Sequence, residues 1–426
     1  MPYALPPTGD LRWRKPQPLG PSHSYSPNSV PFDATKFGPI CAQSKYTSAG
    51  NHGGDEIEYS EDCLRLNIWT PVPKPGEEDK KWPVKLWLHG GWFQVGDPSQ
   101  DAGMDPTELI STGGLNAIVV AMGYRLNIFG FLAGAELAEE NGGEAVGNYG
   151  LWDQRLAMEW VQENISAFGG DVNNVTLAGR SAGAYAVHAH ALYAFQHPEE
   201  KKLFHRIVMI SNAIPAQPKT PAEAQPQFDE VCAFFNIPSE LQGNQKLARL
   251  RKVVTSDLVE MIMKLKHHTF RPLTDDLFIL PGMIEYHQSG AFAKAFKEAG
   301  FKLFIGEMLN EESLYAATNS PEPHYESLFT QVENYYAPSV TERVLKYYKL
   351  PISQERQEWV DVYGIIISDG QVRAPSRFVA DSLYQHGVSV DDIWRYRISY
   401  RLSFLDGKVA PWSWGVTHAM DKPIWK

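Results

Sequence analysis

The sequence predicts an α/β fold in which helices flank a central, mostly parallel and twisted sheet. Short apolar runs bounded by Gly and Pro alternate with longer segments of helical spacing, and this alternation is typical of parallel sheets. A serine between two glycines directly follows one of these runs and opens a helical segment. The 426 residues, 43% of them hydrophobic, are enough to bury a large core, and we expect a single domain over residues 1–426.

The elements are expected in the following order. The first 80 residues are rich in Pro, Gly, Ser and Asn, which favours irregular structure with one short strand at its end. The apolar runs predict strands at 64–69, 82–88, 116–122, 175–178, 206–210, 301–305 and 394–399. Helical spacing predicts helices over 151–165 and from Ala182 to Ala194. Residues 216–300 are charged and punctuated by Pro, which indicates a helix-rich cap or insertion.

Charge and composition exclude several classes of protein. The formal net charge of −11 argues against nucleic acid or an anionic membrane as a partner, because phosphate binding needs a basic surface. No apolar run reaches the ~20 residues that a transmembrane helix needs. His188, His190 and the pair His267-His268 lack partners at metal-ligand spacing, so we expect packing roles for them. No metal site and no cofactor are expected, and the oligomeric state stays open.

The segment Gly179-Arg180-Ser181-Ala182-Gly183 fits the pattern G-x-S-x-G of a nucleophile elbow. In this turn a serine sits between a strand and a helix in a strained conformation, and bulky neighbours would clash. The amino terminus of the following helix offers N–H groups to a developing oxyanion. The expected strand–turn–helix context favours a catalytic serine over a Gly/Ser loop that merely caps a helix.

A second motif, His89-Gly90-Gly91-Trp92-Phe93, follows the strand expected at 82–88. Esterases use an HGGG-type segment here, because its backbone N–H groups complete the oxyanion hole. Trp92 replaces the third glycine of that pattern, but it keeps its N–H donor. Its side chain must turn away or form part of a pocket wall. We expect Gly91, Trp92 and Ala182 to donate, and Gly90 to provide the turn that directs them.

These segments, with 61–68, 147–156 and 168–171, resemble the type B carboxylesterase/cholinesterase family of α/β-hydrolases, in particular its fungal members. The resemblance covers essentially the whole chain. It implies the α/β-hydrolase fold and a serine hydrolase that cleaves small-molecule carboxylic esters through an acyl-enzyme. Choline esters are not expected as substrates, because residues 42–62 contain no Trp for a cation–π contact.

The resemblance also implies the partners of Ser181. Glu311 falls on the position of the family's acid, and Glu312, where the family usually has Gly, is the alternative. Among the later histidines, which include His324 and His386, only His418 lies in a segment that resembles the family's Gly-x-x-His. A surface-loop histidine is the alternative there. The expected triad is therefore Ser181, Glu311 and His418.

Two further expectations follow from the resemblance. Cys41 and Cys63 match a family disulfide, but in the cytosol the pair would stay reduced, so both states are left open. Arg180, where many active relatives have Glu, has two interpretations. A free guanidinium would lower the pKa of the catalytic histidine and attract anionic esters, whereas an ion pair with an acidic neighbour would make it structural.

The chain opens without a leader-like segment, which predicts a cytosolic protein if Met1 is the true start and leaves secretion open otherwise. Both ends look trimmed relative to the family. The interpretation as an active esterase therefore has two alternatives. The chain could be a non-catalytic binding or adhesion member of the same fold, or a homologue inactivated by truncation.

Overall fold

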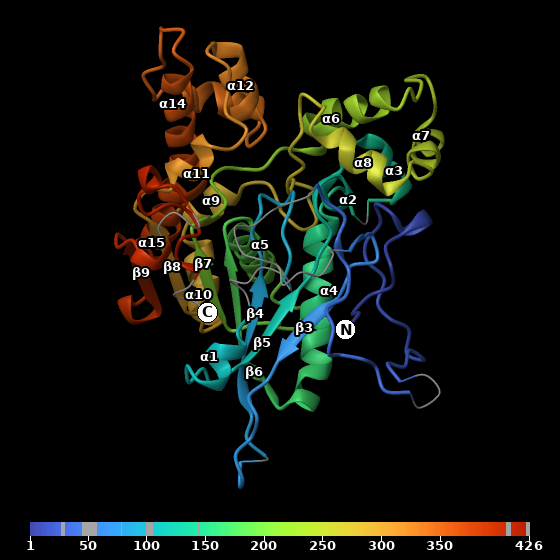
Figure 1. Cartoon of the computed structure of the whole chain (residues 1–426), viewed down its shortest axis with the longest axis vertical. Helices are drawn as coiled ribbons and strands as arrows, with labels where there is room; N and C mark the ends of the chain where they lie inside the picture. Colours follow the sequence, from blue (N-terminus) through green and yellow to red (C-terminus); the bar gives the residue numbers. More distant parts are fainter. Residues whose placement is uncertain are drawn as a thin grey trace.

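The computed structural model describes residues 1–26, 30–44, 58–77, 79–98, 105–143, 145–405 and 410–422. A seven-stranded sheet runs through its centre in the order β3-β5-β4-β6-β7-β8-β9 (Figure 1). The strands are β3 (Leu66–Trp69), β4 (Trp82–Leu88), β5 (Ile118–Met122), β6 (Gly170–Arg180), β7 (Arg206–Ile210), β8 (Leu303–Met308) and β9 (Ile393–Ile398). Two further short strands, β1 (Ile40–Cys41) and β2 (Tyr59–Ser60), pair with each other in parallel.

All neighbouring pairs in the large sheet are parallel except β3 with β5, which is antiparallel. Every residue of β5 is buried, as its uninterrupted apolar run indicates. The predicted α/β fold with a mostly parallel sheet is confirmed. The predicted strands all form, with ends shifted by a few residues; β6 is extended most, because it pairs with β4 from Gly170 onward.

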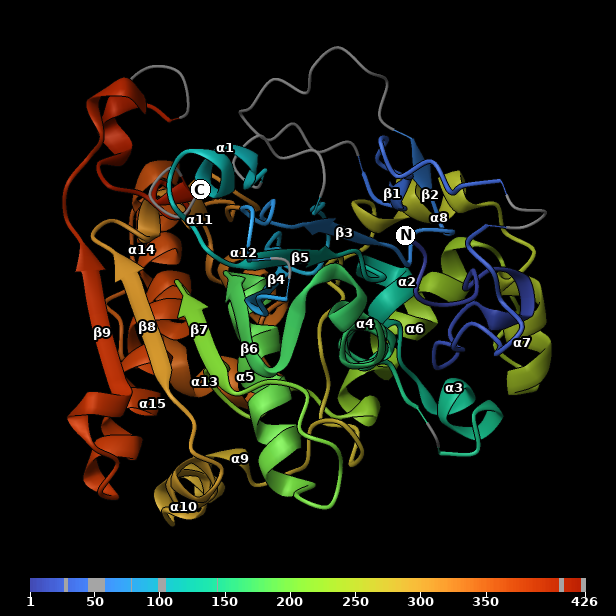
Figure 2. The same cartoon turned by 90° about the horizontal axis from the view of Figure 1, so that it is seen from below.

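The main core lies between the sheet and the helices on one of its faces. Helix α5 (Ala182–Gln196) packs against β6 and β7, and α15 (Ala374–Gln385) packs against β8. Helices α4 (Tyr149–Asn164) and α10 (Ala291–Glu298) also contact α5. Figure 2 shows α5, α10 and α15 on the same side of the strands. The opposite face carries a smaller apolar cluster around Trp87 and Ile210.

Two groups of helices lie beyond the end of the sheet toward which the central strands point (Figure 1). One contains α3 (Ala135–Glu140), α6 (Pro221–Phe234), α7 (Gly243–Leu250) and α8 (Thr255–Ile262). The other contains α11 (Glu312–Ala316), α12 (Tyr325–Glu333), α13 (Pro338–Leu345) and α14 (Arg356–Ser368), and it has an apolar cluster of its own. The carboxyl ends of the parallel strands therefore face a space between two helical groups.

The segment 216–300 is helix-rich, but only part of it forms a cap. Its later helices, α9 (Met283–Gln288) and α10, return to the flank of the sheet and contact α15. The short helices α1 (Thr107–Ser111) and α2 (Asn127–Phe131) belong to loops after β4 and β5. Among the described residues, no helix combines the length and apolar character needed to cross a bilayer.

Candidate active site

Ser181 lies on the turn between β6 and α5, where the motif predicts it. Its backbone has φ 56° and ψ −126°, a positive-φ conformation that is strained for any residue with a side chain. The Ser181 N–H donates to the carbonyl of Ile210, the last residue of β7, over 2.8 Å. The neighbouring strand thus holds the serine in this strained turn.

The two motif glycines are required by close approach. A Cβ on Gly179 would lie 2.4 Å from the carbonyl carbon of Gly183, and a Cβ on Gly183 would lie 2.1 Å from the carbonyl oxygen of Leu88. A side chain at either position would therefore collide with backbone. The elbow packs against the end of β4, from which the HGGW segment emerges.

That segment runs beside the serine. A Cβ on Gly90 would lie 3.0 Å from the Cβ of Ser181, and Gly91 has φ 116°, which a side chain would not tolerate. The N–H groups of Gly91, Trp92 and Ala182 make no hydrogen bond to any described residue, so all three can serve as donors. The structure places Gly90 beside Ser181, with Gly91 and Trp92 next along the loop and Ala182 directly after the serine.

Side-chain hydrogen bonds, several of them to distant parts of the chain, hold this loop in place. Gln94 donates to the carbonyl of Trp92 over 3.0 Å and accepts from the N–H of Phe270 over 3.1 Å. Asn127 donates to the carbonyl of Gln94 over 3.0 Å, and the Tyr124 hydroxyl donates to the carbonyl of His89 over 2.8 Å. Preorganised donors of this kind need no rearrangement when charge develops on a substrate.

Glu311 and His418 meet in a direct, buried contact. Nδ1 of His418 lies 2.5 Å from Oε2 of Glu311, and both side chains are at most 3% exposed. The other Glu311 oxygen accepts the N–H of Met308 over 2.7 Å, which fixes the carboxylate. Tyr315 packs beside the His418 ring at 5.5 Å between centroids. Because a carboxylate only accepts hydrogen bonds when ionised, this contact favours the imidazole tautomer that carries its proton on Nδ1.

The Ser181 hydroxyl and the His418 ring make no hydrogen bond to each other in the described part of the chain. Such contacts are often long without substrate and shorten when it binds. Their loops are nevertheless joined one residue upstream of the serine. Nε of Arg180 lies 3.2 Å from Oδ1 of Asp421, and these side chains are 5% and 0% exposed. This buried ion pair supports the structural interpretation of Arg180.

Asn310 joins the acid loop to the histidine loop. Its N–H donates to the carbonyl of Val416 over 2.9 Å, and its Oδ1 accepts the N–H of Val416 over 3.1 Å. Gly415 lies so close that a Cβ there would be 2.3 Å from Asn310 Oδ1. Asn310 therefore sets the separation of the loops that carry Glu311 and His418.

Glu312, the alternative acid, points away from the histidine. Its carboxylate accepts from Asn310 Nδ2 over 3.1 Å and pairs with Arg373. Burial by itself would raise the pKa of Glu312, but hydrogen bonds from the backbone, Asn310 and Arg373 lower it below its usual value. The remaining histidines also lie elsewhere: His324 caps α12, and His386 contacts the carbonyl of Ser382.

A cavity of about 440 Å³ opens beside His418 and the HGGW segment. His418 and its neighbours Thr417, Ala419 and Met420 line one part of it, and Trp92 lies in the lining as well. Further lining residues come from both helical groups and from the histidine loop, among them Ile262, Thr269, Leu314, Tyr335 and Trp414. The lining is mostly apolar, which suits an uncharged organic substrate.

Cys41 and Cys63 are joined by a disulfide, the oxidised state of the two left open. Two of the four histidines expected to pack do so within the core: His188 Nε2 lies 3.0 Å from His287 Nε2, and His190 Nε2 lies 2.9 Å from Gln154 Oε1. Both contacts are buried and link helices within the core. His267 instead contacts the carboxylates of Glu230 and Glu333.

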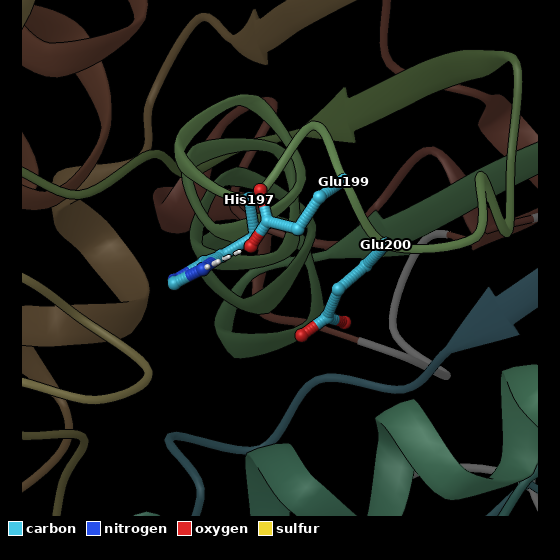
Figure 3. A group of neighbouring side chains, drawn as sticks. All are labelled: His197, Glu199 and Glu200. Atoms are coloured by element: carbon cyan, nitrogen blue, oxygen red, sulfur yellow. Dashed lines mark hydrogen bonds and ion pairs between the residues drawn. The ribbon is translucent and has the colours of Figure 1, made fainter.

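One group of three potential metal ligands occurs among the described residues: His197, Glu199 and Glu200, near the end of α5 (Figure 3). His197 Nδ1 contacts Glu199 at 3.4 Å. Glu200 is engaged by Arg155 and by the Tyr193 hydroxyl, the latter over 2.8 Å. The group is largely exposed and remote from the elbow, so we assign no metal to it.

The parallel sheet, the nucleophile elbow at the end of β6 and the Glu–His contact after β8 define an α/β hydrolase. The model of the carboxylesterase family matches residues 1–425, and the chain belongs to this family. The resemblance inferred from the motifs is thereby confirmed.

Three relatives illustrate the similarity. An uncharacterized esterase/lipase of Schizosaccharomyces pombe is 41% identical over 99% of this chain and 78% of its own length. A carboxylic ester hydrolase of Gibberella moniliformis is 38% identical over the whole chain and 78% of its length. A cholinesterase of Mus musculus is 32% identical over 88% of this chain and 62% of its own.

Proposed function

We propose that the chain is a serine esterase that cleaves uncharged carboxylic esters through an acyl-enzyme. The observation that carries this proposal is the buried 2.5 Å contact between Glu311 and His418, placed beside a strained serine elbow. A buried carboxylate–imidazole pair, next to three N–H groups that make no hydrogen bond to any described residue, suits catalysis better than a binding module.

The steps follow from these groups. Ser181 Oγ attacks the ester carbonyl while Nε2 of His418 takes its proton. The C–O bond to the alcohol then breaks, and the imidazolium returns the proton to the leaving oxygen. A water molecule repeats the sequence and releases the carboxylic acid. Glu311 stabilises the imidazolium and stays ionised throughout.

The charge that develops on the carbonyl oxygen is met by the N–H groups of Gly91, Trp92 and Ala182. Loss of one such donor costs about 3 kcal/mol in the transition state of other acyl-transfer enzymes. Triad hydrolysis needs no cofactor. We keep choline esters outside the proposal on the sequence argument alone, since residues 45–57 lie outside the described residues.

A fluorophosphonate probe tests the proposal. We expect one covalent adduct, on Ser181, and none on the Ser181→Ala variant. Ser211→Ala is the matched control, because Ser211 directly follows the adjacent strand with φ 54° but its hydroxyl makes no hydrogen bond to a histidine among the described residues, and this variant should label like the wild type. Folded wild-type protein without an adduct would instead favour the non-catalytic or truncation-inactivated alternatives.

A further inference from the structure

Trp92 occupies the place of a glycine in the oxyanion loop and keeps a glycine-like backbone, with φ 58°. Its indole packs against the apolar cluster of the helices α11–α14 and lines the active-site cavity. The same residue therefore offers its N–H to the oxyanion and its side chain to whatever is bonded to the carbonyl carbon. A large ring on a residue of the oxyanion loop limits the space for one substituent of the carbonyl carbon.

Tyr335 continues this surface, and we call Trp92 and Tyr335 the aromatic wall. Both line the cavity. The wall is supported from behind: Trp92 and Tyr335 both pack against the apolar cluster of the helices α11–α14, and the guanidinium carbon of Arg271 lies 4.9 Å from the centroid of the Tyr335 ring. Closely packed groups cannot retreat to admit a longer substrate without a cost in packing.

The chemistry of the reaction decides which part of an ester meets the wall. The carbonyl oxygen must point at the N–H donors, and the leaving oxygen must face Nε2 of His418, which protonates it. The alcohol group then extends along the histidine loop, where Trp414 and Met420 line the cavity. The acyl chain is the remaining substituent, and we expect it to extend away from His418 toward Trp92, the lining residue that also carries an oxyanion donor.

We infer that the aromatic wall limits the length of the acyl group, so that the preferred substrates are esters of short carboxylic acids with more freedom in the alcohol. This inference rests on the proposed esterase function and names its substrate class. One methylene group that a hydrophobic pocket accepts or rejects changes kcat/KM by roughly 10- to 200-fold. A wall of two aromatic rings should therefore make kcat/KM fall sharply as the acyl chain becomes longer.

The test measures kcat/KM for p-nitrophenyl acetate, butyrate, hexanoate and octanoate, and for acetates of alcohols of increasing length. In the wild type we expect kcat/KM to fall steeply from the acetate to the octanoate. Trp92→Gly keeps the N–H donor and suits the positive φ, and it should raise the octanoate-to-acetate ratio on the order of 100-fold. Tyr335→Leu, which leaves the oxyanion loop untouched, should shift the ratio in the same direction.

Trp414→Ala is the matched control, since it removes a cavity tryptophan on the histidine side and should alter the alcohol series only. The inference is overturned if the wild type already prefers octanoate, if both wall variants change the ratio less than about threefold, or if they move the alcohol series instead. Failure of the proposed function gives a different result, namely no fluorophosphonate adduct and no hydrolysis of any ester.

Discussion

The buried ion pair between Arg180 and Asp421 offers the sharpest test of how the catalytic loops are held. Arg180 directly precedes the serine and Asp421 follows His418 by three positions, so the pair ties the nucleophile turn to the histidine loop. In Arg180→Met, the buried Asp421 carboxylate would lose the guanidinium whose Nε lies 3.2 Å from its Oδ1. The double variant Arg180→Met/Asp421→Asn removes both charges and should recover much of the stability that Arg180→Met alone loses.

Removing one partner of a buried pair costs about 3–5 kcal/mol, because the other charge stays uncompensated. With an unfolding entropy of roughly 2.1 cal/mol/K per residue, a chain of 426 residues unfolds with about 0.9 kcal/mol/K. The melting temperature of Arg180→Met should therefore fall by about 3–6 °C. Arg356→Met serves as control, since its ion pair with Glu322 is more than half exposed and should contribute under ~1 kcal/mol.

Calorimetry and the pH profile of kcat/KM distinguish the two interpretations of Arg180. If the pair is structural, Arg180→Met loses stability and kcat, while the acidic limb of the profile and the preference between neutral and anionic esters stay unchanged. An unchanged melting temperature together with a shifted acidic limb and weaker hydrolysis of anionic esters would refute this reasoning. Arg180 would then act on the histidine through its charge.

Three other predictions concern the acid, a half-buried lysine and the disulfide. Glu311→Gln should lower kcat by roughly 10⁴-fold, because the imidazole would adopt the wrong tautomer, whereas Glu312→Gln should retain most of the wild-type kcat. The opposite result would identify Glu312, not Glu311, as the acid of the triad. Burial and Arg180 lower the pKa of Lys85 to about 8. The unfolded chain therefore binds more protons between pH 8 and about 10.4, and Lys85→Met should raise the melting temperature at pH 7 by a margin that shrinks across that range; a constant margin would contradict this. A Cys41→Ala/Cys63→Ala variant should lose roughly 3 kcal/mol of unfolding free energy through the opened loop, measured in denaturant without reductant, and an unchanged midpoint would contradict it.

Much of the fold could be predicted because its signals are local. A buried strand such as β5 is a short apolar run, and the elbow needs glycines at fixed distances from Ser181, so both appear directly in the sequence. Helix α4 was expected almost at its observed bounds. The burial of Asp153 within it was not anticipated, because its partner Arg125, 2.7 Å away, comes from the loop after β5.

The parts that could not be predicted depend on contacts between distant segments. No sequence signal around Asn310 indicates that its side-chain amide will accept a hydrogen bond from the N–H of Val416. Likewise, no signal around Arg180 indicates that it will form an ion pair with Asp421. The position of the Trp92 indole likewise depends on Tyr335 and on helices that follow in the chain much later. Sequence motifs thus identify the groups that react, because chemistry restricts their types and spacing. The residues that position these reacting groups and shape the space around them act through packing contacts. Many different residue types could make such contacts, so no motif identifies them.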